Sequence, residues 1–156
     1  MAQIEFVGID KYFERLDELG KHSIGLCKRA LYDGAAVLAD AVRSEVQALP
    51  VTDRNTEPQQ VLGYERDGLL AGLGIAKMKD DGGVVSTRVD FDGYNRLKSK
   101  TYPNGHPNSM IARAINSGTS KRPKNPFMNR ATRAARAKAE AAMAARMDAD
   151  IEEIMK

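Results

Sequence analysis

The spacing of hydrophobic positions predicts a long helix in the first third of the chain. Between about residues 21 and 49, apolar side chains recur every three or four positions, which is typical of a helix that packs one face on a core. These positions are Leu31, Ala35, Leu38, Ala39, Val42, Val46 and Leu49. We expect Pro50 to end this helix, because proline lacks the backbone N–H that a helix interior needs.

A second long helix is predicted at the other end, from about Asn125 to Met155. Ten alanines fall between Ala131 and Ala149, and alanine has the highest helix propensity. The larger apolar contacts come from Met143, Met147, Ile151 and Ile154. Such a helix carries few large apolar groups per turn and is weakly stable alone. This pattern favours a subunit that completes its core in an oligomer.

Shorter elements fill the remaining chain. Ile4 and Phe6 alternate with polar neighbours and predict a strand over residues 2–7, after which Asp10 begins a helix that we expect Gly20 to interrupt. Apolar residues of that helix share one face; they are Tyr12, Phe13, Leu16 and Leu19. Next come a helical piece from Tyr64 to Leu73, and a hairpin whose strands, 75–79 and 84–91, flank a turn at 80–83.

Two loops and a short helix complete the predicted order. Residues 50–63 contain two prolines and no apolar period, and residues 94–107 are rich in proline, glycine and asparagine, so we expect both to be flexible. A short helix starts at Asn108 or Ser109 and closes at Gly118. The chain therefore reads as a single α+β domain over residues 1–156. We expect a small antiparallel sheet with a β-hairpin, packed against the long N-terminal helix and the long Ala-rich C-terminal helix.

Charge is distributed unevenly along the 156 residues. Residues 1–92 carry 11 Lys/Arg and 16 Asp/Glu, residues 93–139 carry 11 Lys/Arg and no acid, and the net charge of the chain is +3. Such segregation indicates an oriented surface that faces nucleic acid or an acidic patch on a partner, or else a solvated basic helix face. No run of 18 apolar residues exists, and the start of the chain has acids where a signal peptide needs apolar residues. We therefore expect that the protein does not associate with a membrane and that it is synthesised in a cytoplasm.

Candidate catalytic and metal-binding residues are few. His22 and His106 lack a paired spacing, Cys27 is the only thiol, and no glycine-rich phosphate loop is present. Asp90 and Asp92 leave open a metal-dependent nuclease, although such a site needs further acids. We accordingly predict no catalytic residue, no metal, no cofactor and no small-molecule substrate.

The basic segment 96–138 is the remaining candidate for function. Clustered cations suffice for contact with phosphates, so a small non-specific DNA-binding protein is one hypothesis. Sequence-specific readout would require a docking motif, which the segment does not contain. Tyr94 and Tyr102 are too few for a platform on which single-stranded bases stack.

Several motifs in the second half resemble one family. The segments FDGYN at 91–95, YPNGHPN at 102–108 and IARAINSGTSKRPKNPFMNRA at 111–131 are similar to the gene-product-ten-like family of tailed-phage proteins. The opening QIEFVGID and GLLAGLGIAK at 68–77 also look like members of this family, in the same order. The most specific positions are Gly118, Thr119, Ser120, Pro123, Pro126 and Phe127, together with Ser117, Met128 and Ala131.

This resemblance implies a structural role without catalysis. Members are neck or tail-completion (head–tail joining) proteins of long, non-contractile-tailed phages and prophages. They lie between the portal-side connector of the filled capsid and the tail tube, and are assembled in the bacterial cytoplasm. By similarity, the expected partners are further copies of the chain in a ring, hexameric at the tail end or dodecameric nearer the portal, and the neighbouring neck, connector or tail-tube proteins.

The residue types fit that expectation. Gly118 can end the short helix with a positive φ, Pro123 and Pro126 stiffen the following loop, and Phe127 can staple the start of the long helix. The cations that we expect to face an interface or passing DNA are Lys121, Arg122, Lys124, Arg130 and Arg133. We favour the interface, because tight phosphate binding would hinder DNA from sliding out.

Overall fold

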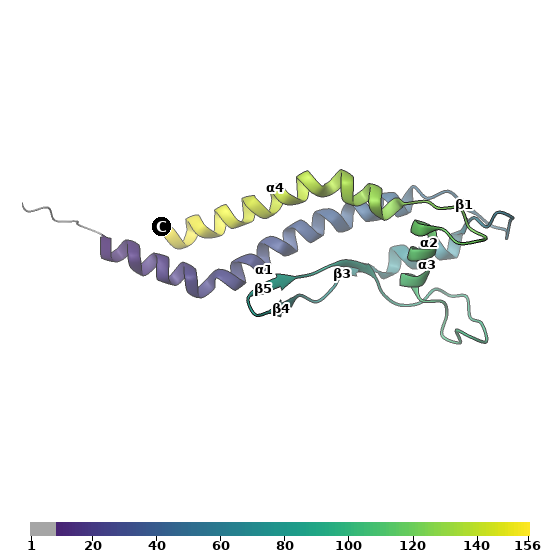
Figure 1. Ribbon diagram of the computed structural model, residues 1–156, viewed down its shortest axis with the longest axis horizontal. Coiled ribbons are helices and arrows are strands. Elements are labelled where there is room, and N and C mark those ends of the chain that lie inside the picture. Colours follow the sequence, from purple (N-terminus) through teal and green to yellow (C-terminus); the bar gives the residue numbers. More distant parts are fainter. Residues whose placement is uncertain (1–8) are drawn as a thin grey trace, which may run out of the picture.

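Two long antiparallel helices dominate the computed structural model, which describes residues 9–156 (Figure 1). Helix α1 spans Ile9–Gln47 and helix α4 spans Phe127–Met155. They lie side by side along most of their length, and the shorter elements gather towards the end where α4 begins (Figure 1). The strand predicted at residues 2–7 lies outside the described residues.

Helix α1 is continuous, so the expected interruption at Gly20 is wrong. Glycine inside a helix costs about 1 kcal/mol relative to alanine, which a single position can bear when the turns on both sides propagate cooperatively. The residues flanking Gly20 are mostly good helix formers, including Leu16, Leu19 and Lys21. The helix then ends before Pro50, as predicted.

Small residues allow α1 and α4 to approach closely. A Cβ on Gly34 would lie 2.6 Å from Cγ of Met143, so the glycine leaves room for the methionine side chain. Ala30 and Ala35 of α1 and Ala135 of α4 are also buried. Because alanine brings little apolar area, this contact depends on close approach of the two backbones.

Ion pairs at the edge of the α1–α4 contact fix the antiparallel register. Asp150 accepts from Nε of Arg29 at 2.8 Å, Asp33 from Nε of Arg146 at 2.7 Å, and Glu45 from Arg130 at 2.9 Å. At the far end, the Arg15 guanidinium donates to the backbone carbonyl oxygens of Met155 and Lys156, which are the unsatisfied acceptors of a helix C-terminus.

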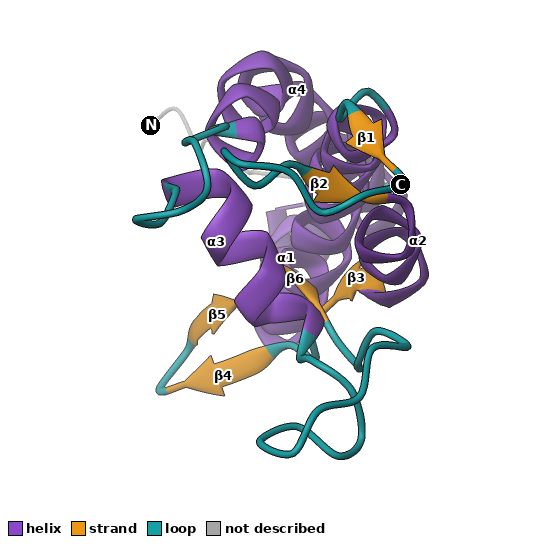
Figure 2. Ribbon diagram, turned by 90° about the vertical axis from the view of Figure 1, so that its right-hand side faces the viewer, coloured by secondary structure: helices purple, strands orange, loops and turns teal. Residues whose placement is uncertain are grey.

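The strands are short and form pairs rather than one broad sheet. Strand β3 (Leu73–Ile75) pairs antiparallel with β6 (Val89–Phe91), and β4 (Lys79–Asp81) pairs antiparallel with β5 (Val84–Ser86). The predicted hairpin is therefore present, with its turn at Gly82 and Gly83, both at positive φ. A third pair, β1 (Val51–Thr52) with β2 (Val61–Leu62), is parallel. Figure 2 shows these strands beside the helices, with β4 and β5 furthest from α4.

The core lies where the short helices meet the long ones. Helix α2 spans Gly63–Gly72 and α3 spans Asn108–Ser117, with Gly118 just past the end of α3 as predicted. The rings of Phe91 and Phe127 meet edge to face with centroids 6.1 Å apart. Around them are buried Val42, Val46, Leu49, Val61, Leu69, Leu73, Ile111, Ala112, Ile115 and Ala131. The predicted α+β fold class is confirmed, with both long helices and the antiparallel hairpin in the expected order.

Candidate interaction surface at the α3–α4 loop

The loop between α3 and α4, residues 118–126, contains most of the motif positions. It begins at Gly118, where φ is 76° and ψ is 167°, a region that is essentially restricted to glycine. A Cβ at this position would also lie 3.0 Å from the backbone nitrogen of Lys124. The loop folds back on its own start, and only glycine fits there without strain.

Thr119 then closes the loop through its side chain. Its hydroxyl oxygen accepts from the backbone N–H of Arg122 at 3.0 Å and of Lys121 at 3.3 Å, and its own N–H donates to the Arg122 carbonyl at 2.9 Å. Further backbone bonds attach the loop on both sides, from Asn125 to the Ile115 carbonyl and from Gln59 to the Lys121 carbonyl. This short polar loop therefore has a dense set of internal hydrogen bonds.

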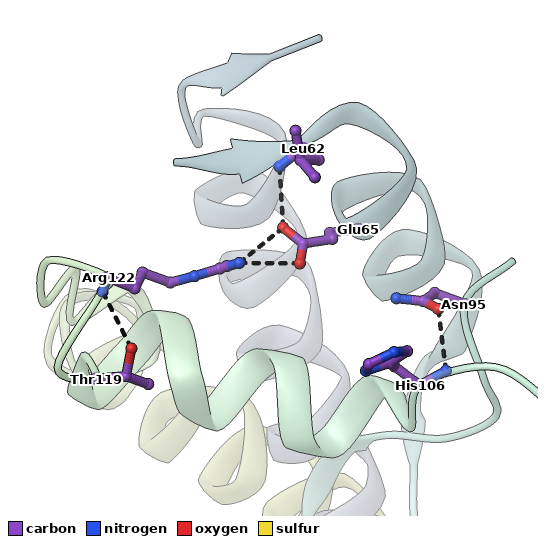
Figure 3. A network of polar contacts seen from close by, with 6 residues as sticks. All are labelled: Leu62, Glu65, Asn95, His106, Thr119 and Arg122. Atoms are coloured by element: carbon purple, nitrogen blue, oxygen red, sulfur yellow. Dashed lines mark hydrogen bonds and ion pairs between the residues drawn. The ribbon is translucent and has the colours of Figure 1, made fainter. Parts of the chain in front are cut away.

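A buried ion pair anchors the loop to α2. Nη2 of Arg122 donates to both carboxylate oxygens of Glu65, at 2.9 Å and 3.1 Å, and both side chains are almost fully buried (Figure 3). Glu65 also accepts from the backbone N–H of Leu62 at 3.0 Å, which satisfies a free donor at the start of α2. Arg122 was expected to be a surface cation facing a partner or DNA. That assignment is corrected, because the Arg122 guanidinium is buried and paired with Glu65 inside the chain.

Phe127 and Asn116 join the loop to the start of α4. The Phe127 ring is fully buried, as expected for a residue that staples the start of a helix. The Asn116 side chain accepts from the backbone N–H of Met128 at 3.1 Å and donates to Asn129 at 3.3 Å. Pro126 precedes the helix and is half-buried, while Pro123 is exposed. The direction in which α4 leaves the loop is therefore fixed by several contacts.

Two lysines project from this framework. Lys121 and Lys124 are exposed and form no ion pair with any residue of 9–156, and Ser120 beside them is exposed too. The surface next to Lys121 is hollowed, and Thr56 and Pro58 also line this hollow. The loop thus presents positive charge on a supported backbone.

The other predicted cations divide into two groups. Arg130 is held by Glu45 and by Asn125, to which it donates at 2.8 Å, so its charge is largely compensated. Arg136 likewise pairs with Glu140 one turn further along α4. The remaining cations are exposed and form no ion pair within the described part of the chain; they are Arg96, Lys98, Lys100, Arg113, Lys121, Lys124, Arg133 and Lys138.

A second loop, residues 92–107, lies beside α2. Oδ1 of buried Asn95 accepts from the backbone N–H of His106 and of Leu97, at 3.1 Å and 3.0 Å, which joins the two ends of the loop (Figure 3). The Arg96 guanidinium lies 5.5 Å from the centre of the Tyr64 ring. Burial raises the pKa of Tyr64, the Glu65 carboxylate raises it further, and the nearby arginines oppose that shift.

Within residues 9–156, no group of three or more His, Cys, Asp and Glu side chains is placed to hold a metal ion. Asp90, a candidate in the nuclease hypothesis, forms an ion pair with Arg88 at 3.1 Å. Over the same residues, none of the helices has the length and hydrophobicity needed to span a bilayer.

Comparison with known proteins adds no family assignment. No family model, curated protein or solved structure matches the chain.

Sequence reasoning missed the partner of Arg122. Glu65 lies 57 residues earlier, and no local pattern links it to the loop. One signal was available: Glu65 is three residues after Leu62, at the position where an acid can cap the start of a helix. That spacing indicates a role at a helix start but not the long-range pair.

Proposed function

We propose that the chain is a structural protein of a phage virion, acting in the neck as a head–tail joining or tail-completion component that assembles into a ring. The observation that carries this proposal is the loop at 118–126, which a buried ion pair anchors and which offers Lys121 and Lys124 outward. Such a loop suits recognition of an acidic protein surface, because its charges are oriented before contact. We propose no chemical step.

The resemblance and the geometry point to the same loop. The motif glycine, Gly118, occupies a backbone conformation that other residues avoid, and Thr119 and Phe127 each make the contacts described above. A motif in which Gly118, Thr119 and Phe127 support one loop conformation is expected where that loop has to be presented identically by every copy in an assembly. This argument supports the neck function through the role of the loop.

The experiment that tests this proposal has two stages. Light scattering over a concentration series gives the absolute mass, and negative-stain images of any large species show its form. We expect rings, or binding of the chain to filled capsids or tails that lack this component, recovered by sedimentation. A chain that stays monomeric at every concentration and binds neither structure would contradict the proposal.

A second candidate is non-specific DNA binding through the basic segment 96–138. It is favoured by the eight exposed cations of this segment that lack an ion-pair partner among residues 9–156. Neutralising phosphates with several such residues makes affinity fall steeply with salt. Titration of a fluorescent duplex at about 50 and about 200 mM salt tests it: a drop of about tenfold or more supports DNA binding, and no measurable binding at the lower salt removes it.

A further inference from the structure

Helix α1 carries an apolar stripe that no part of residues 9–156 covers. Phe13, Leu16 and Ile24 are 57%, 39% and 41% exposed, and Cys27 is exposed as well. With Gly20, these residues recur at intervals of three or four and fall within an arc of about 80° at 3.6 residues per turn. We call Phe13, Leu16, Gly20, Ile24 and Cys27 the α1 stripe. Contiguous apolar surface of this kind usually marks an interaction site.

Helix α4 carries a matching stripe of small residues on its outer face. Ala134, Ala137, Ala141 and Ala144 are all exposed and follow alternating steps of three and four, the spacing of a coiled-coil seam. They also fall within an arc of about 80°. We call these four residues the α4 stripe. Alanines at such positions let a second helix pack closely, with a distance between the helix axes of about 8 Å, at the short end of the usual range of about 8–10 Å. Large side chains of the partner helix then fill the space beside the alanines.

Charge complements the two stripes. Asp10 and Asp17 flank one side of the α1 stripe, where Asp17 also pairs with Lys21 at 2.5 Å, whereas Arg133 and Lys138 flank the α4 stripe on either side. Neither Arg133 nor Lys138 forms an ion pair within residues 9–156, so their charges are free to meet acids of another molecule. Opposite charges beside an apolar seam set the choice of partner in helix pairing.

The two stripes face away from each other. Arg15 and Arg29 of α1, which bond to the C-terminal end of α4 and to Asp150, lie more than a quarter turn from the α1 stripe. On α4 the buried Ala135 and the Asp33-paired Arg146 lie on the opposite side from the α4 stripe. One chain therefore cannot join its own two stripes, but neighbouring chains can.

We infer that the α1 stripe of one copy packs against the α4 stripe of the next copy. The occupant of each stripe is thus a second copy of this chain. A contact between two different surfaces is head-to-tail, so it generates a ring or a filament and not a closed dimer. The stripes have comparable lengths, about 21 Å from Phe13 to Cys27 and about 15 Å from Ala134 to Ala144. This inference rests on the proposed function and identifies the surfaces through which the ring forms.

Cysteine cross-linking tests the contact directly, because Cys27 is the only cysteine and lies in the α1 stripe. The native chain is mixed with a Cys27→Ser, Ala137→Cys variant and treated with a short bismaleimide. We expect a cross-linked pair containing one chain of each kind, and at most a trace from either chain alone. The matched control, Cys27→Ser with Lys98→Cys, places an exposed thiol in the 92–107 loop and should give no such product.

A chain with both Cys27 and Ala137→Cys extends the test. Head-to-tail packing predicts a ladder of three or more linked chains, whereas a contact of α1 with α1 gives only Cys27–Cys27 dimers, already in the native protein. That second pattern would overturn the inference. Rings seen by light scattering and microscopy without the mixed cross-link at any of the four α4 positions would also overturn it, while leaving the proposed neck function standing. A persistent monomer that binds no capsid or tail would instead contradict both.

Charge reversal is a second, independent test of this contact. Arg133→Glu with Lys138→Glu should abolish assembly of this variant alone, and mixing it with Asp10→Lys, Asp17→Lys copies should restore mixed contacts. All four positions are exposed, and the one ion pair that is lost, Asp17 with Lys21, is exposed too, so the free energy of unfolding should change by about 1 kcal/mol or less. Assembly of the Arg133→Glu, Lys138→Glu variant at native strength would overturn the pairing of the stripes.

Discussion

Arg122 and Glu65 form a buried ion pair that joins the α3–α4 loop to the first turn of α2. The Arg122 side chain is 6% exposed and that of Glu65 is 5% exposed, and both carboxylate oxygens accept from the same guanidinium nitrogen. The pair holds together segments that are 57 residues apart in the chain. Burying two charges is unfavourable unless they remain paired, so removing one partner should be far more damaging than its exposure alone suggests.

We predict that Glu65→Gln or Arg122→Met lowers the free energy of unfolding by about 3–5 kcal/mol, because each leaves an uncompensated buried partner. The double variant Glu65→Gln, Arg122→Met should lose less than the sum of the two, which denaturant unfolding of all four proteins measures as a double-mutant cycle. Arg130→Met is the matched control, since its pair with Glu45 is partly exposed and is worth about 1 kcal/mol or less. Additive losses at Glu65 and Arg122 would show that the pair does not act as a unit.

Two glycines should respond in opposite directions to the same substitution. Gly118→Ala should destabilise the chain by about 1–3 kcal/mol, because its φ of 76° with ψ of 167° lies in a region that residues with a Cβ avoid. Gly20→Ala should stabilise it by about 0.5–1 kcal/mol, because Gly20 is in a helix and an added Cβ meets nothing within 4 Å. Thermal and denaturant unfolding of both variants measure the effects. Equal signs would contradict the backbone geometry described for at least one of them.

Local patterns were sufficient to predict most elements of the fold. Long helical periods identified the two long helices, and the Asp80–Gly83 turn located the hairpin, because each signal arises from residues that are neighbours in sequence. Gly20 was misinterpreted because a local propensity was weighed without the cooperativity of a 39-residue helix. The parallel pairing of Val51 with Val61 was not predicted, since a two-residue strand has no period to detect.

The candidate surface was predicted less completely. Gly118 and Phe127 play the roles expected from their residue types, because a helix end and a buried aromatic are local features. Arg122 could not be separated from Lys121 and Lys124 by sequence, since all three are cations within four positions. Only the tertiary contact with Glu65 distinguishes the buried arginine from the exposed lysines. The same holds for the α1 stripe, because Phe13 and Leu26 look alike until a neighbour covers one of them.

The close approach of α1 and α4 at Gly34 gives a further prediction. In the native chain, Gly34→Ala should cost about 1–3 kcal/mol, because the new Cβ would lie 2.6 Å from Cγ of Met143 and overpacks the contact. In a Met143→Ala background the same change should instead stabilise by up to about 1 kcal/mol, because only the gain in helix propensity remains. Urea unfolding of the four proteins measures this reversal. If Gly34→Ala has the same effect in both backgrounds, Met143 is not the residue that requires the glycine.

The exposed lysines of the α3–α4 loop provide the test that separates stability from function. Lys121→Glu with Lys124→Glu should leave the free energy of unfolding within about 0.5 kcal/mol of native, because both side chains are exposed and unpaired within residues 9–156. The same variant should lose binding to filled capsids or tails, measured by co-sedimentation, because reversed charge repels an acidic partner surface. Lys98→Glu with Lys100→Glu is the charge-matched control in the 92–107 loop and should retain binding. If the Lys121, Lys124 variant binds as well as the native chain, the loop does not contact the partner, and the proposed recognition through this surface has to be abandoned.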